Sequence, residues 1–279
     1  MKIGIVGLGL IGGSMAKTIK ENTDHFVLGF DLSDEVLSKA KLIQVIDGVL
    51  TKENLSECDF VILSIYPSAT VDFVKKHQSY FKKGALVIDC CGVKEYVCSC
   101  LKDVAENNDF VFIGGHPMAG IAAVGFDNSL STMFKDASMI LTPYSGTDIR
   151  DMKKAKELFL SLGFSEIKIT TPESHDKMIA YTSQLAHIVS SAYIKNPLAS
   201  DFKGFSAGSF KDMTRVAKLN ETMWTELFYD NKTYLQESID TLIECLNEYK
   251  EALDNDDKDK MFQLLKEGRQ KRENMEDYK

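Results

Sequence analysis

Apolar and polar positions follow two different patterns along this chain, and the change falls near residue 171. Before it, short apolar runs separate stretches in which apolar residues recur every three or four positions. The runs predict strands at residues 2–7, 26–31, 60–65, 86–90, 110–114 and 138–142, and the stretches predict helices that include 10–21, 33–42, 71–80 and 94–107. Strands that alternate with helices indicate βαβ units, so we expect an α/β fold with a doubly wound, mostly parallel sheet.

After Pro172 the strand-like runs cease and helical periodicity dominates. It covers residues 173–193, 210–219, 221–253 and 258–269. We therefore expect a nucleotide-binding domain over residues 1–171 and an all-α domain over residues 172–279. The charged residues 270–279 are expected to form a solvated, frayed tail.

Length and charge narrow the classes of function. A chain of 279 residues has room for two cores of ordinary size. Its 33 Lys and Arg against 41 Asp and Glu give a net charge of -8, which disfavours nucleic acid and anionic membranes as partners. An anionic substrate would therefore need a local basic cluster. No secretory signal and no run of about 18 apolar residues is visible, so we expect a cytoplasmic protein.

Cysteine and histidine give little support for disulfides or a metal site. The six cysteines include two sequence neighbours and no C-x-x-C pair, which favours reduced thiols. Five histidines occur without an H-x-H or H-E-x-x-H pattern, so no metal site is expected.

A glycine-rich turn follows the first predicted strand and opens the first predicted helix. Such a turn lets the backbone approach a pyrophosphate, and the helix N-terminus offers free N–H groups to it. A turn that needs glycine only for its backbone conformation is the alternative. The residues expected to bind a dinucleotide here are Gly7, Leu8, Gly9, Leu10, Ile11 and Gly12.

Asp31 makes the dinucleotide interpretation more specific. It ends the second predicted strand, 19 residues after Gly12, where a carboxylate can accept hydrogen bonds from the adenosine ribose. The same carboxylate would repel a 2′-phosphate, so the sequence favours NAD over NADP.

His116 lies where a ligand of an open α/β sheet is expected. Its segment, GGHPMAG at residues 114–120, leaves a predicted strand at its carboxyl end. A histidine there could accept a proton from an alcohol whose hydride passes to a nicotinamide. The alternative is a surface-loop histidine without a role.

Four segments together resemble the prephenate and arogenate dehydrogenases. They are GLGLIGGS at residues 7–14, GGHPMAG at 114–120, FKDMTRVA at 210–217 and the Met-Trp pair at 223–224. The resemblance implies a Rossmann domain followed by a helical dimerisation domain, a homodimer, and an active site in the cleft between the domains. It implies NAD-dependent oxidative decarboxylation of prephenate to 4-hydroxyphenylpyruvate in tyrosine biosynthesis, with arogenate as the alternative substrate. His116 would then hydrogen-bond the ring 4-hydroxyl.

One position departs from this family. Its members often carry a serine before Val-Lys, where this chain has Gly92 before Val93 and Lys94. Without that hydroxyl, Gly92 is expected to give at most a backbone contact to the cofactor, and Lys94 a role near the cofactor or the helix start.

The helical domain supplies the candidate substrate-binding residues. His187 lies on a polar stripe with Gln184 and Ser191, a pattern usually typical of solvent exposure, but the resemblance implies a position in the cleft. Lys211 and Arg215 are helical i, i+4 neighbours, and the resemblance implies that Arg215 binds a substrate carboxylate. A surface salt bridge from Arg215 to Asp212 is the alternative. Trp224 is expected to serve packing more than substrate contact.

Two other classes remain open at this stage. A β-hydroxyacid dehydrogenase would also pair a nucleotide-binding domain with a helical one, but would use a lysine on the first long helix between the domains as acid and base. A NAD-binding sensor without turnover would fit the departure at Gly92.

Overall fold

The computed structural model describes residues 1–121 and 123–276. By their contacts these residues form two compact units, Met1–Asn231 and the segment from Lys232 onward. No helix in these described ranges is long and apolar enough to cross a membrane.

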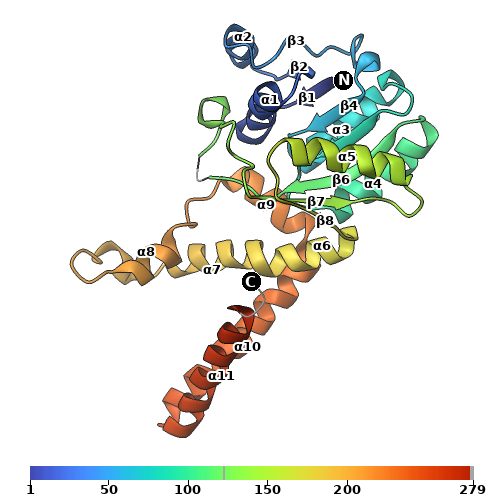
Figure 1. Ribbon diagram of the computed structural model, residues 1–279. Helices are drawn as coiled ribbons and strands as arrows, with labels where there is room; N and C mark the ends of the chain where they lie inside the picture. Colours follow the sequence, from blue (N-terminus) through green and yellow to red (C-terminus); the bar gives the residue numbers. More distant parts are fainter. Residues whose placement is uncertain (122, 277–279) are drawn as a thin grey trace. The chain divides into compact units, whose positions relative to one another are not determined.

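A sheet of eight strands forms the centre of the first unit (Figure 1). The strands lie in the order β3-β2-β1-β4-β5-β6-β7-β8. Strands β1 to β6 pair in parallel, β7 is antiparallel to β6, and β8 is parallel to β7. Their bounds are β1 Lys2–Val6, β2 Phe26–Phe30, β3 Gly48–Val49, β4 Phe60–Leu63, β5 Leu86–Asp89, β6 Val111–Pro117, β7 Ser138–Thr142 and β8 Glu166–Ile169. The predicted α/β, mostly parallel sheet is confirmed.

Helices cover both faces of the sheet, which explains why its central strands are apolar throughout. One face packs against α1 (Leu10–Asn22), α2 (Asp34–Leu42) and α5 (Ile149–Ser161). The other face packs against α3 (Pro67–His77) and α4 (Glu95–Asn107). Short 3₁₀ turns lie at Leu55–Glu57, Gln78–Tyr80 and Phe126–Asn128.

Two strands and one helix have no counterpart among the elements predicted from the pattern. Strand β3 has only two residues, too few for a periodicity to show. Strand β8 lies at the edge of the sheet and is mostly exposed, so its sequence lacks an apolar run. Helix α5 buries only one face, through Ala155, Leu158 and Phe159.

Strand β6 continues three residues beyond the predicted end at Gly114. Its first half pairs with β5, and its second half, Gly114 to Pro117, pairs with the antiparallel β7. His116 therefore lies on a strand opposite Ile140, and the predicted end of that strand at residue 114 is wrong. Pairing with the antiparallel β7 extends β6 through this segment.

A continuous helical run begins the part of the chain that follows the sheet. It comprises α6 (Pro172–Ile179), a wider π-helical turn η4 (Ala180–Gln184) and α7 (Leu185–Tyr193). Its start is defined by Pro172 in the first turn and by Thr171, whose side chain accepts from the Ser174 N–H. Three shorter elements follow in this unit: η5 (Pro197–Ser200), α8 (Gly208–Thr214) and α9 (Glu221–Asp230). The predicted all-helical second part is confirmed.

The second unit consists of two helices, α10 (Lys232–Asp254) and α11 (Lys258–Glu276). The single helix predicted over residues 221–253 is wrong, because the chain leaves the helical conformation at Asn231, which has φ -115° and ψ 27°. The predicted frayed tail is also wrong up to residue 276, since α11 continues through it. Pairs at i, i+4, such as Arg269 with Glu273 at 2.6 Å, favour this continuation. Residues 277–279 of that prediction lie outside the described residues.

Candidate active site

The glycine-rich turn has the geometry that a bound pyrophosphate requires. Gly7 has φ +85°, a conformation that L side chains rarely adopt. A Cβ on Gly12 would lie 1.8 Å from the Gly7 carbonyl oxygen, so only glycine lets α1 start this close to β1. A Cβ on Gly9 would meet nothing within 4 Å, which leaves open space beside the backbone. Leu10 and Ile11 then form the first turn of α1, which has no side-chain cap, so its N–H groups are available to phosphate oxygens.

Asp31 follows β2 and joins this turn directly. One carboxylate oxygen accepts from the Leu8 N–H at 2.8 Å, and the other accepts from the Ser33 N–H at 3.0 Å. A carboxylate offers about four acceptor positions, so about two remain for ribose hydroxyls. The side chain is half-buried beside the turn. Asp31 therefore holds the glycine-rich turn and keeps acceptor positions of its carboxylate open.

Asp31→Ser is expected to reduce the preference for NAD over NADP. The change removes a negative charge that would repel a 2′-phosphate, and it also weakens the anchor of Leu8. We expect the KM for NAD to rise while kcat changes little. Steady-state kinetics with both cofactors measure this, with Asp31→Asn as the matched variant that keeps the shape without the charge. Equal kcat/KM for both cofactors in the unchanged protein would contradict the assignment.

The backbone that carries His116 is clamped from the end of β5. Asp89 accepts from the Gly115 N–H at 3.0 Å, and Lys94 Nζ donates to the Gly115 carbonyl at 2.6 Å. Asp89 and Lys94 also form an ion pair with each other, and both side chains are fully buried. Burial alone would lower the pKa of Lys94, but Asp89 raises it above its ordinary value, so the ammonium stays charged. A Cβ on Gly115 would lie 2.4 Å from the Asp89 carbonyl oxygen, so no side chain fits there.

His116 is linked through a second histidine to a buried carboxylate. Its Nδ1 lies 2.8 Å from Nε2 of His175 on α6, and Nδ1 of His175 lies 2.6 Å from Oδ1 of Asp176. Burial, then His175, then the charge of Lys94 hold the pKa of His116 well below its ordinary value. Burial also lowers the pKa of His175, although Asp176 opposes this shift. His116 is therefore a neutral imidazole near pH 7 and can accept a proton.

Sequence reasoning missed Asp89, His175 and Asp176. His175 is 2% exposed and Asp176 is fully buried, although both occur in the polar N-terminal half of α6. The sequence does contain a signal for these two residues: a His-Asp pair at helix positions that the amphipathic pattern predicts to be exposed to solvent. Nothing in the local sequence indicates that the partner of His175 is His116. One of the two roles predicted for Lys94 was at the start of the helix. Lys94 does lie there, and its N–H donates to Asp176 at 2.7 Å.

Gly92 lies in the loop between β5 and α4, under helix α9. A Cβ built there would lie 3.4 Å from the Leu227 side chain, in van der Waals contact with it. Leu227 is itself positioned by Gln184, whose Nε2 donates to the Leu227 carbonyl at 3.0 Å. The loop therefore offers only backbone atoms at Gly92, as expected from its sequence.

Three cysteine thiols belong to this loop or to α4: Cys90 and Cys91 lie in the loop, and Cys98 lies on α4. Burial raises the pKa of Cys90 and of Cys98 to about 12, and raises the pKa of Cys91 well above its ordinary value. They remain protonated near neutral pH and are poor nucleophiles. All six cysteines are free in the structure.

His187 lies farther along the same helical run, against Trp224. The two ring centroids are 4.0 Å apart at an angle of 30°, and Nδ1 of His187 donates to the Ser183 carbonyl at 2.8 Å. Trp224 also lies 5.3 Å from Phe228, so its packing role on α9 is evident. Gln184, from the same predicted polar stripe, is buried at 1% exposure and does not face solvent.

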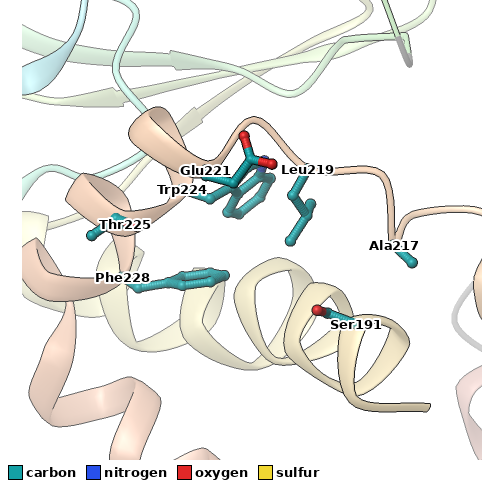
Figure 2. A pocket seen from close by; sticks show the side chains of 7 residues that line it. All are labelled: Ser191, Ala217, Leu219, Glu221, Trp224, Thr225 and Phe228. Atoms are coloured by element: carbon teal, nitrogen blue, oxygen red, sulfur yellow. The ribbon is translucent and has the colours of Figure 1, made fainter. Parts of the chain in front are cut away.

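A pocket of about 270 Å³ opens beside Trp224. Figure 2 shows the Trp224 and Phe228 rings on one side and Ser191 of α7 on the other. The residues that line it are Ser191, Ala217, Leu219, Glu221, Trp224, Thr225 and Phe228. Aromatic walls with a few polar groups are typical of small-molecule sites.

Lys211 and Arg215 come just before this pocket in the chain. Lys211 is on α8, and Arg215 follows the last residue of α8 and precedes the pocket residue Ala217 by two positions. The predicted helix through residue 219 is wrong, because α8 ends at Thr214. Both side chains are exposed, and within the described ranges Arg215 has no salt bridge to Asp212. The guanidinium is therefore available to an anion.

Comparison with known proteins identifies both parts of the chain. The nucleotide-binding domain of prephenate dehydrogenase matches residues 15–167, and the prephenate dehydrogenase dimerization domain matches residues 171–267. Prephenate dehydrogenase of Bacillus subtilis is 28% identical over 97% of this chain and 75% of that protein. The structure of Aquifex aeolicus prephenate dehydrogenase with hydroxyphenyl propionate and NAD+ has a TM-score of 0.87 and 29% identity, over 99% of this chain and 98% of the other. Synechocystis arogenate dehydrogenase has a TM-score of 0.84 and 26% identity, over 99% of this chain and all of the other.

Proposed function

Since this chain belongs to the prephenate dehydrogenase family and is an NAD-dependent oxidoreductase, we propose that it oxidatively decarboxylates prephenate to 4-hydroxyphenylpyruvate and carbon dioxide. The observation that carries this proposal is the neutral, half-buried His116, whose Nδ1 is occupied by His175. In the described part of the chain its Nε2 has no hydrogen-bond partner. That nitrogen is free to bind a substrate hydroxyl.

The chain's own contribution is to hold the substrate and to move one proton. When bound, NAD accepts the hydride that leaves ring carbon C4. His116 Nε2 takes the proton of the 4-hydroxyl as that hydride departs, and returns it to the ring oxygen once the ring carboxylate has left as carbon dioxide. The electron pair of the broken C–C bond enters the ring and makes it aromatic, so no proton is released overall. Aromatisation drives the step, and orientation and charge control are left to the protein.

The basic residues near the pocket are proposed to hold the substrate's carboxylates. Arg215 offers a planar fork that suits a carboxylate, with Lys211 as a second positive charge and the His187 ring, stacked on Trp224, as a further contact. A net charge of -8 makes such a local cluster necessary for a dianionic substrate. Gly7, Leu8, Gly9, Leu10, Ile11, Gly12, Asp31 and the Gly92 backbone are proposed to contact NAD.

The choice between prephenate and arogenate is tested by kinetics on both. The two substrates differ only in a keto or an amino group on the side chain, and we propose prephenate as the preferred one. NADH formation at 340 nm should show the higher kcat/KM with prephenate. A higher value with arogenate would make the protein an arogenate dehydrogenase, and turnover of neither would overturn the proposed function.

We also propose that the protein is a cytoplasmic homodimer, with the domains divided near residue 171. Large apolar side chains stand exposed on α10 and α11: Ile243, Leu246, Leu253, Phe262, Leu265 and Met275, each at 49% or more. Apolar surface of this kind usually marks an interface. The family match to a dimerization domain over residues 171–267 supports the same conclusion.

Sedimentation at micromolar concentration is expected to give a dimer, with an interface of roughly 2,000 Å² or more. Leu246→Glu should shift the protein towards monomer, because a charge would replace an apolar contact. Ile149→Glu is the matched control, since Ile149 is 81% exposed on α5 in the nucleotide-binding part. A folded, active monomer of the unchanged protein would contradict the proposal.

A further inference from the structure

His116, His175 and Asp176 form a chain of hydrogen bonds whose proton positions are determined at one end. Asp176 Oδ1 accepts from the Lys94 N–H at 2.7 Å, and Oδ2 accepts from the Glu95 N–H at 2.8 Å. These two donors lie at the N-terminus of α4, a position that favours a negative charge. Asp176 is therefore an acceptor, and the short 2.6 Å contact to His175 requires the proton on His175 Nδ1.

The proton position on His175 also determines the proton position on His116. Burial keeps His175 neutral at neutral pH by lowering its pKa, so a proton on Nδ1 leaves Nε2 with a lone pair. His175 Nε2 then accepts from His116 Nδ1 at 2.8 Å, and the proton of neutral His116 is on Nδ1. Its Nε2, which faces no protein partner among the described residues, carries the lone pair that a general base needs.

We propose that His175, held by Asp176, is a positioning residue that fixes the tautomer and the ring orientation of His116 so that Nε2 is always the unprotonated nitrogen. The proposal rests on the proposed function, in which His116 is the base. An imidazole free in water prefers to carry its proton on Nε2, which would block proton acceptance there. The same dependence on tautomer is known from serine proteases, where a carboxylate orients the catalytic histidine.

A purely structural role does not account for this arrangement. Asp176 alone satisfies the two N–H groups at the start of α4, and its backbone carbonyl accepts from Asn231 at 2.8 Å. His175 adds a fully buried polar ring side chain whose two nitrogens contact Asp176 and His116. Burying such a ring is costly unless its hydrogen bonds are used, and here one of them ends on the base.

The tautomers can be read directly in the unchanged protein. The chain has only five histidines, so selective 15N-histidine labelling gives few signals, which His→Gln variants can assign. At pH 7 we expect both His116 and His175 to be neutral with the proton on Nδ1. A proton on Nε2 of His116, or a charged His116, would overturn the proposal, whether or not the protein turns over prephenate.

Two variants of His175 separate positioning from packing. In His175→Gln, a side-chain oxygen near the position of Nε2 still accepts from His116, whereas His175→Leu fills the space without an acceptor. We expect His175→Leu to lower kcat by roughly 10²-fold or more, with the KM for prephenate and the affinity for NAD little changed. His175→Gln should restore kcat to within about tenfold of the unchanged protein, because the acceptor is back.

Equal kcat in the Leu and Gln variants would overturn the proposal, since packing alone would then explain the residue. Thermal unfolding of each variant shows whether a loss of activity reflects loss of fold. If the unchanged protein turns over neither prephenate nor arogenate, the proposed function fails, and the labelling result still decides the tautomer independently.

Discussion

His116→Asn should reduce kcat by roughly 10²–10⁴-fold, the range typical for the loss of a general base. The asparagine amide can occupy the position of Nδ1 and donate to His175 as the imidazole does, so the fold and the site around it should persist. What is lost is Nε2, the nitrogen proposed to accept the 4-hydroxyl proton. The measurement is kcat with saturating prephenate and NAD, together with the Kd for NAD from fluorescence titration.

An unchanged Kd for NAD is the internal control, because the glycine-rich turn does not contact His116. The pH profile supplies a second check. Since burial holds the pKa of His116 below its ordinary value, activity should persist into mildly acidic solution and fall only as the pH passes that lowered pKa. Near-normal turnover of His116→Asn would move the catalytic role elsewhere, with His187 as the next candidate.

Arg215→Ala should raise the KM for prephenate at least tenfold and leave NAD binding intact. Removing a charge-assisted pair with a carboxylate costs about 1.5–3 kcal/mol, and tenfold corresponds to about 1.4 kcal/mol. Arg215→Lys should recover only part of the loss, because an ammonium keeps the charge without the fork. Steady-state kinetics and thermal unfolding of both variants measure the two effects.

A surface salt bridge would give a different pattern, with normal kinetics and a loss of unfolding free energy below about 1 kcal/mol. Two controls make the comparison sharp. Asp212→Ala removes the alternative partner, and Arg269→Ala removes an exposed arginine that pairs with Glu273 on α11. Both should leave the KM unchanged. A normal KM in Arg215→Ala would mean that the substrate carboxylate binds elsewhere.

The parts of this protein that follow from local sequence were predictable. Alternating apolar runs and amphipathic stretches are enough to indicate a doubly wound sheet, and the spacing of Gly7, Gly9 and Gly12 after a strand predicts a tight turn into α1. Their geometry depends on a few neighbouring residues: a Cβ on Gly12 would lie only 1.8 Å from the Gly7 carbonyl oxygen, so no side chain fits there. Asp31 was likewise indicated by its distance from the turn.

What depends on distant partners was not predictable. Strand β6 extends to Pro117 only because β7 pairs with it, and β7 begins 21 residues later, at Ser138. The end of α9 at Asn231 depends on its side chain, which donates to Gln184 Oε1 at 2.7 Å and to the Asp176 carbonyl. Helical periodicity alone carries no trace of such a contact, so the pattern predicts a helix through it.

The sequence shows that Gly92 replaces a serine common in the family, but it does not show what lies beside that position. The backbone contact expected of Gly92 to the cofactor stays a prediction, and Leu227 lies 3.4 Å from where a Cβ would be. A serine restored at this position would bring its Cβ into contact with that leucine. The space above the loop is therefore already shaped by α9.

Asp176 contacts Lys94 and Glu95 but is synthesised much later than they are. The proposed NAD-contact residues are therefore made before the residues that orient His116. The glycine-rich turn, Asp31 and His116 all leave the ribosome before α6, which carries His175 and Asp176. A nascent chain that ends before α6 already contains every residue proposed to bind NAD. Its His116, however, has no His175 beside it to direct the proton. On the proposed function, His116 therefore gains the neighbour that directs its proton only when α6 docks.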